Sequence, residues 1–435
     1  MKRLGFLLIL AFVAAARGET VSAAATIDLP TALRLAGANN LDIQLAREKV
    51  AEAVAEQEVS RARFFPWITP AIAFRRHENN IQTVDGNIID VDKQSLSAGL
   101  ILGAEIDLGD AYYRNLAARQ IVRANDAALR SRQREMTYRA ASAYFELVRT
   151  RAVVGAGEEA FRIAAEHARQ ADAMASAGLS LKGDIARVVA ARERSGLELS
   201  RMRFEQRAAA ARLAELLHLD PAVDLQPLES DLAPLSLTQN SDDLASLVSH
   251  ALATRPEIDD AQARLQEKRA LQRGAVYGPL VPTLGAQVAY GGLGGGIDST
   301  SLGHNFDVSE DYNFSLSWRV GPGGLFDRSR RHLTAARARM GEIELEKTRD
   351  GIRRQIVEVH AQVAALRNQL VLAQQAMDAS DQAARSSRER RATGVSVVFE
   401  DLQSEEELAR ARRDYLSIIA EYNQAQYALR YAAGQ

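Results

Sequence analysis

Four segments of the chain alternate apolar and polar residues with a period of two, the pattern of a β-strand with one apolar face. In the clearest of them the even positions from Leu96 to Leu108 are all apolar, whereas the odd positions include serines, glycines and two acids. The sequence therefore predicts four strands. They cover about residues 66–76, 95–108, 283–291 and 310–320.

Long helices are predicted for most of the remaining chain. No proline lies between residues 71 and 220 or after residue 322, and a proline inside a helix costs roughly 3 kcal/mol. The first of these arms predicts a helix from about Tyr112 to Ala175, on the order of 95 Å long. Such a helix needs partners along its length. Apolar residues recur every seven positions in both arms, as in a coiled coil: Leu147, Val154, Phe161, Ala168 and Ala175, then Val363, Leu370, Met377 and Ala384.

The chain contains an internal duplication with an offset of 216 residues. Gly178 corresponds to Gly394, Ser180 to Ser396, and the acid Asp184 to the acid Glu400. Each copy reads as a leading helix, two strands with a polar loop between them, a very long helix, a glycine turn and a returning helix. The sequence predicts a first repeat over 26–220, a linker over 221–245 and a second repeat over 246–435, with turns at 178–183 and 394–399.

The N-terminal residues resemble a secretory signal peptide. Lys2 and Arg3 precede an apolar run, and small residues follow at 22–25, which is the order that signal peptidase recognises. We expect residues 1–25 to be the signal, cleaved after about Ala23 to Ala25; a buried N-terminal helix is the alternative. No later segment has the ~18 to 20 apolar residues of a membrane-spanning helix.

The four strands have the length of membrane strands, about 9 to 11 residues. A half-buried sheet in a soluble protein would explain each strand alone, but four of them in an exported chain favour a membrane wall. The smallest common membrane barrels have about eight strands, and an open edge cannot exist in lipid. We therefore expect several chains to close one barrel, with residues 77–93 and the glycine-rich stretch 291–309 as exposed loops.

The chain resembles the TolC family of outer-membrane efflux proteins, the outer membrane factors. The resemblance rests on the duplicated turns "AGLSLKGDI" and "TGVSVVFEDL", the strand-loop-strand units after Pro66 and Pro282, and the C-terminal helix "EEELARARRDYLSIIAEYNQAQYALRYAAG". It implies a mostly α-helical fold with a small membrane β part. In that fold a duplicated coiled-coil tunnel lies in the periplasm, and three protomers each give four strands to a twelve-stranded barrel in the outer membrane.

The resemblance also implies partners and site residues. A homotrimer would sit in outer-membrane lipid as a passive exit duct for efflux or type I secretion, opened by a periplasmic adaptor and energised by an inner-membrane pump. The docking turns would be Gly178, Leu179 and Ser180 with Gly394, Val395 and Ser396. The constriction would involve Asp184, Arg187, Arg391, Glu400 and Gln403. We hypothesise that Arg391 pairs with Asp184 to hold the tip closed; ordinary helix-end charges are the alternative.

The composition argues against several other classes of function. The formal net charge of −2, with arginines interleaved among acids, argues against a nucleic-acid partner. The absence of cysteine excludes disulfides and thiolate metal sites. We predict no catalytic residues, metal site or cofactor, and read "SEEELARARR" as an exposed charged helix face. An exported coiled-coil structural protein that never enters a membrane remains the alternative function.

Overall fold

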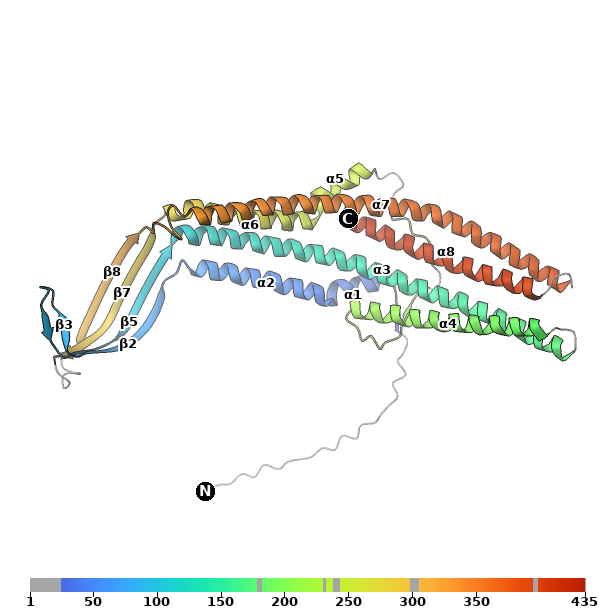
Figure 1. Cartoon of the computed structure of the whole chain (residues 1–435), viewed down its shortest axis with the longest axis horizontal. Helices are drawn as coiled ribbons and strands as arrows, with labels where there is room; N and C mark the ends of the chain where they lie inside the picture. Colours follow the sequence, from blue (N-terminus) through green and yellow to red (C-terminus); the bar gives the residue numbers. More distant parts are fainter. Residues whose placement is uncertain are drawn as a thin grey trace, which may run out of the picture. The chain divides into compact units, whose positions relative to one another are not determined.

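The structure is a computed structural model (Figure 1) that describes residues 25–177, 182–229, 232–237, 243–297, 305–393 and 398–434. It divides into two compact units. The strand unit comprises residues 41–136, 238–362 and 428–435, and the hairpin unit comprises residues 1–40, 137–237 and 363–427. The expected signal peptide lies almost wholly outside the described residues. Among those residues, no helix is both long and apolar enough to cross a membrane.

The strand unit contains a four-stranded sheet in which every neighbouring pair is antiparallel. Its order is β2 (Trp67–His77), β5 (Lys93–Asp107), β7 (Thr283–Gly296) and β8 (Asp307–Ser317). The four predicted strands are confirmed. β2 and β8 form the two edges, and no further strand of the described chain pairs with either edge.

Two predicted loops are partly wrong. Within residues 77–93 a small hairpin pairs β3 (Asn80–Gln82) with β4 (Ile88–Asp90). Its turn contains Asp85-Gly86, a common hairpin signal, with Gly86 at φ +85°. The stretch 291–296 belongs to β7 and pairs with β5; glycine carries no side chain to alternate, so the pattern did not reveal the strand.

Helices lead into and out of the sheet (Figure 1). α2 (Leu41–Ala62) leads to β2, and α6 (Pro256–Tyr277) leads to β7 through the 3₁₀ turn η1 (Gly278–Leu280). α3 (Leu108–Ser176) follows β5 directly, slightly longer than predicted, and α7 (Arg328–Ala392) follows β8. α5 (Leu244–Thr254) precedes α6. Up to its long helix, each copy of the repeat thus has the predicted order of elements.

A buried arginine fastens the junction between α5 and α6. Arg255 is 4% exposed, and its guanidinium donates to Glu257 at 2.8 Å and to Oε1 of Gln355 at 2.7 Å. The same group lies over the ring of Tyr431, 5.1 Å from its centroid. It therefore joins the start of α6, the middle of α7 and the C-terminal end of the chain.

The hairpin unit consists of helix pairs and a two-stranded sheet. β1 (Ala25–Ile27) runs parallel to β6 (Leu225–Pro227), and α1 (Leu29–Asn39) begins where Asp28 accepts a hydrogen bond from the Thr31 amide. α4 (Lys182–Leu216) and α8 (Val398–Ala433) complete the unit with the later parts of α3 and α7. Of the predicted heptad positions, Leu147, Val154, Ala168, Val363 and Ala384 are buried, and Phe161, Ala175, Leu370 and Met377 are partly buried.

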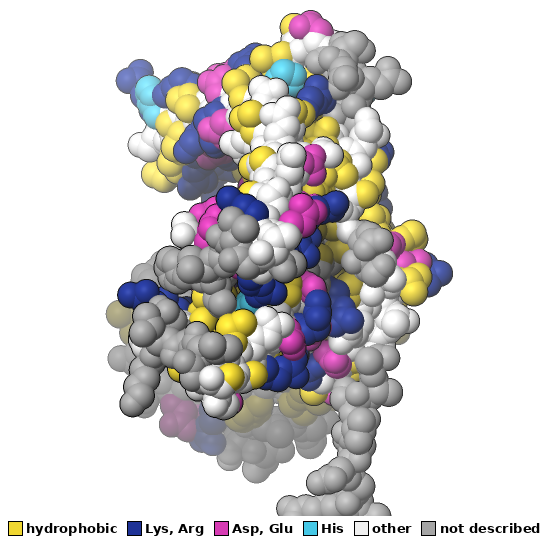
Figure 2. All heavy atoms as spheres, turned by 90° about the vertical axis from the view of Figure 1, so that its right-hand side faces the viewer, with side chains coloured by type: hydrophobic (Ala, Val, Ile, Leu, Met, Phe, Trp, Pro, Cys, Tyr) yellow, Lys and Arg dark blue, Asp and Glu magenta, His cyan; other side chains and the backbone are white. Residues whose placement is uncertain are grey.

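The outer surfaces of the long helices carry charges of both signs. Many pair three or four residues apart on one helix, as Arg149 does with Glu146 and Arg353 with Asp350. The face shown in Figure 2 likewise intersperses basic and acidic side chains. Such pairs contribute only tenths of a kcal/mol each, so these surfaces are solvated rather than specialised.

Candidate functional site

The sheet of the strand unit has one apolar and one polar face. The strand register brings the even residues of all four strands to the same face, where Ile72 is 82%, Phe314 71% and Leu100 53% exposed. A soluble sheet would bury such a face against a second layer. Other apolar residues of this face are Ile68, Pro70, Phe74, Leu96, Ala98, Leu102, Ala104, Ile106, Leu284, Ala286, Val288, Tyr290, Val308, Tyr312 and Leu316, and the same register also places Arg76, Gln94 and Glu310 on it.

The opposite face carries mainly small or polar side chains. It is formed by Trp67, Thr69, Arg75, Ser95, Ser97, Gly99, Ile101, Gly103, Glu105, Asp107, Thr283, Gly285, Gln287, Asn313, Ser315 and Ser317, among others. A hollow of about 290 Å³ lies against this face, lined by residues that include Trp67, Glu105, Gln287 and Asn313. The polar face can therefore border water.

The backbones of β5 and β7 approach closely on the polar face. A Cβ atom added at Gly99 would lie 2.5 Å from the carbonyl oxygen of Tyr290, and one at Gly291 would lie 2.4 Å from that of Ala98. Glycine permits such a close approach of two strands, as at the bends of barrels. Gly99 and Gly291 are paired in the register, so the polar face carries no side chain at this point.

The transition from strand to helix is fixed by two aspartates. Asp107 ends β5, and its Oδ1 accepts a hydrogen bond of 2.8 Å from the amide of Asp110 in the first turn of α3. Asp110 in turn forms ion pairs with Arg114 and, at 2.8 Å, with Arg330. Burial raises the pKa of Asp110, but the hydrogen bonds from these arginines outweigh it and bring that pKa below its ordinary value. Arg114 and Arg330 are equivalent residues of the duplication, so both repeats meet at one carboxylate.

The predicted docking turns cannot be compared with the structure. Gly178, Leu179, Ser180, Gly394, Val395 and Ser396 all lie outside the described residues, and so does the side chain of Asp184. The pairing of Arg391 with Asp184 therefore stays a prediction.

The other predicted constriction residues are present at the helix ends. Glu400 forms an ion pair with Arg390, and Gln403 donates a hydrogen bond of 3.1 Å to Glu407. Arg187 lies exposed in α4.

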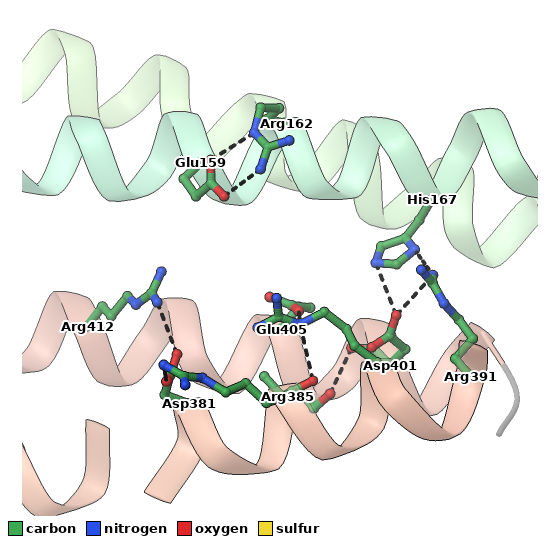
Figure 3. Close-up of polar contacts among 12 residues, drawn as sticks. Glu159, Arg162, His167, Asp381, Arg385, Arg391, Asp401, Glu405 and Arg412 are labelled. Atoms are coloured by element: carbon green, nitrogen blue, oxygen red, sulfur yellow. Dashed lines mark hydrogen bonds and ion pairs between the residues drawn. The ribbon is translucent and has the colours of Figure 1, made fainter. Parts of the chain in front are cut away.

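Arg391 contacts His167 and Asp401, neither of which we predicted (Figure 3). Its Nη1 lies 2.6 Å from His167 Nδ1 and 3.0 Å from Asp401 Oδ2, while His167 Nε2 is 3.5 Å from the same oxygen. His167 is 4% exposed and Asp401 0%. Three helices, α3, α7 and α8, thus meet at one buried charged group.

A second buried acid extends this cluster along α8. Glu405 Oε1 lies 2.9 Å from Arg388 Nε, and burial raises the pKa of Glu405. The expectation that "SEEELARARR" forms an exposed charged face is wrong for this residue. Asp401, Glu405 and Leu408 are all buried and follow the spacing of one helix face. That spacing could have revealed both acids.

The second half of the chain matches a known protein family. Residues 247–435 match the family model described as outer membrane efflux protein. Among curated proteins no sequence matches the chain.

Several solved structures share the fold over most of the chain. A membrane protein from Pseudomonas aeruginosa and the CmeC outer membrane channel of Campylobacter jejuni each give a TM-score of 0.79 at 19% identity. Each alignment covers 93% of this chain, with 93% and 85% of those chains. The open state of the MtrE outer membrane channel of Neisseria gonorrhoeae gives 0.71 at 17% identity, covering 93% of this chain and 88% of that one. At these identities the likeness establishes a common fold.

Proposed function

We propose that the chain is a member of the outer membrane efflux protein family and a passive exit duct in the outer membrane. Its residues 247–435 match that family's model, and its fold is shared with solved outer membrane channels over 93% of its length. Solutes would leave through it as the last stage of an efflux or secretion pump. The observation that carries the proposal is the sheet with an exposed apolar face and an opposite polar face that borders a hollow.

Lipid and water are the two environments that this sheet fits. Burying apolar surface contributes about 25 cal/mol per Å², and side chains such as Ile72 and Phe314 gain nothing while they face water. Lipid on the apolar side satisfies them, and a water-filled lumen on the polar side satisfies Ser97, Gln287 and Asn313. The hydrogen-bonding groups of the edge strands β2 and β8 then need partners, because lipid offers none.

Several copies joined edge to edge supply those partners. We propose a homotrimer in which β8 of one protomer pairs with β2 of the next, which gives twelve strands from three copies. The close approach of β5 and β7 at Gly99 and Gly291 is of the kind found at the bends of barrels.

The remaining partners follow from the same proposal. The long helices would form a tunnel in the periplasm, and the turns at Gly178 and Gly394 would dock a periplasmic adaptor coupled to an inner-membrane pump. Asp184, Arg187, Arg391, Glu400 and Gln403 would narrow the tunnel near these turns. The duct itself would carry out no chemistry.

Fractionation and conductance test the proposal against an exported coiled coil. The mature chain should appear in outer-membrane fractions of a Gram-negative host as an oligomer whose migration on a denaturing gel changes with heating. In a planar bilayer the purified oligomer should conduct ions. Recovery in the soluble periplasmic fraction without any bilayer conductance would favour the coiled coil.

A further inference from the structure

We propose that His167, Arg391 and Asp401 form a latch that holds the α7–α8 hairpin against α3 and releases when His167 gains a proton. This inference rests on the proposed function, because the latch would act on a tip that opens. Arg391 is the penultimate residue of α7 and Asp401 lies in the first turn of α8. The latch therefore lies beside the turn predicted at 394–399.

The contacts of His167 fit one protonation state. A guanidinium can only donate hydrogen bonds, so Nδ1 of His167, 2.6 Å from Arg391 Nη1, must accept and carry no proton. The ring proton then lies on Nε2, which faces Asp401 Oδ2 at 3.5 Å. The tautomer is assigned from these partners. The neutral imidazole lies between the guanidinium of Arg391 and the carboxylate of Asp401.

A second proton on the ring opposes this arrangement. It would set an N–H group against the N–H group of Arg391 and add a like charge inside a buried site. Burial first, and Arg391 second, lower the pKa of His167, against the opposite pull of Asp401 and Glu166. Arg391 belongs to α7, Asp401 to α8, and Glu166 to α3, the helix of His167 itself. Farther along, Glu405 of α8 pairs with Arg388 of α7.

The acid of the latch, Asp401, makes few contacts. Among the described residues, neither carboxylate oxygen of Asp401 makes a hydrogen bond of good geometry, and Ser387 Oγ of α7 also lacks a partner. Asp401 has one ion pair, with Arg391 at 3.0 Å, and faces Nε2 of the neutral His167 at 3.5 Å. A buried ion pair contributes little net stability, so added repulsion between His167 and Arg391 favours separation of the helices.

The sign and size of the pH effect follow from linkage. The lowered pKa belongs to the latched form, whereas a released His167 in water titrates near its ordinary value of about 6.5. The latch is therefore fully favoured above about pH 6.5 and weakens as the pH falls below it. Between pH 7.5 and 5.5 the ratio of released to latched protein should rise by at most about tenfold. Glu405 acts with the opposite sign, because its pKa is raised in the closed form; Glu405→Gln removes that contribution.

Single-channel recording at pH 7.5 and 5.5 tests the latch on the purified oligomer. The wild type should open more often at pH 5.5, by up to about tenfold, and the Glu405→Gln variant at least as strongly. His167→Gln should respond less than about twofold, because a glutamine amide can accept from Arg391 and donate to Asp401 but does not titrate. His332→Gln is the matched control: His332 is exposed on α7 in the strand unit, and its removal should leave the response unchanged.

Each outcome separates the latch from the duct. A wild type that conducts but ignores pH, or a His167→Gln variant that keeps the full response, overturns the latch and leaves the duct intact. Absence of conductance from both wild type and Arg391→Ala overturns the duct. If His167→Gln fails to assemble, hydrogen exchange of wild-type residues 382–393 and 398–408 decides. After correction for intrinsic rates, protection should fall at pH 5.5, and unchanged protection contradicts the latch.

Discussion

Arginine at the centre of the apolar face should prevent assembly, whereas arginine on the polar face should not. Leu100 lies at the middle of β5, paired with Pro70 and Tyr290, and is 53% exposed. An arginine facing lipid at the bilayer midplane costs about 2 to 4 kcal/mol. Three copies would multiply this to about 6 to 12 kcal/mol for the assembled barrel.

Ser97→Arg in the same strand is the matched control. Ser97 lies three residues away on the polar face, where its hydroxyl makes a long contact of 3.5 Å with the Ala73 carbonyl. We expect a change of about 0.5 kcal/mol or less, typical of a solvated surface position. The assay is the yield of heat-modifiable oligomer in outer-membrane fractions and the temperature at which it dissociates. Equal yields for the two variants, or a greater loss for Ser97→Arg, would refute the assignment of the faces.

Three further predictions concern the helices and their junctions. Arg391→Ala should raise the open probability of the isolated channel at pH 7.5, because Asp401 loses its ion pair of 3.0 Å; unchanged recordings would remove Arg391 from the gate. Arg255→Met should destabilise each protomer by about 3 kcal/mol, seen as a lower dissociation temperature, because Glu257 and Gln355 lose their shared partner. Asp110→Asn should lower that temperature at pH 7 but not near pH 3, since a lowered carboxyl pKa stabilises the fold only above the ordinary value and its contribution is lost in acid. An equal deficit at both pH values would contradict the proposed role of the Asp110 charge.

The strands and long helices were predictable because each leaves a periodic trace in the sequence. Alternation located β2, β5, β7 and β8 to within a few residues, and the heptad row from Leu147 to Ala168 located the buried face of α3. The glycine end of β7 was missed because glycine has no side chain to alternate. The hairpin of β3 and β4 was missed because three-residue strands are too short to show a period.

The buried cluster at His167 was unpredictable for a different reason. Its members come from three helices, and His167 lies more than two hundred residues before Arg391 and Asp401. A single sequence does not say which helix faces meet. Asp401 and Glu405 could have been placed on the buried face by their spacing with Leu408, but their acidic character suggested solvent. The partner of Arg391 could be found only in three dimensions.

Disulfide cross-linking between the edge strands tests the central claim most directly. The chain has no cysteine, and within one protomer β2 and β8 are separated by two strands, about 14 Å, whereas a disulfide needs Cα atoms within about 7 Å. Cysteine pairs combining Ala71 or Ala73 in β2 with Asn313 or Ser315 in β8 can therefore join only different copies. The account predicts, for at least one pair, an outer-membrane product whose ladder on a denaturing gel ends at three chains. No cross-link for any pair, or a ladder that continues beyond three, would contradict a closed barrel of three protomers.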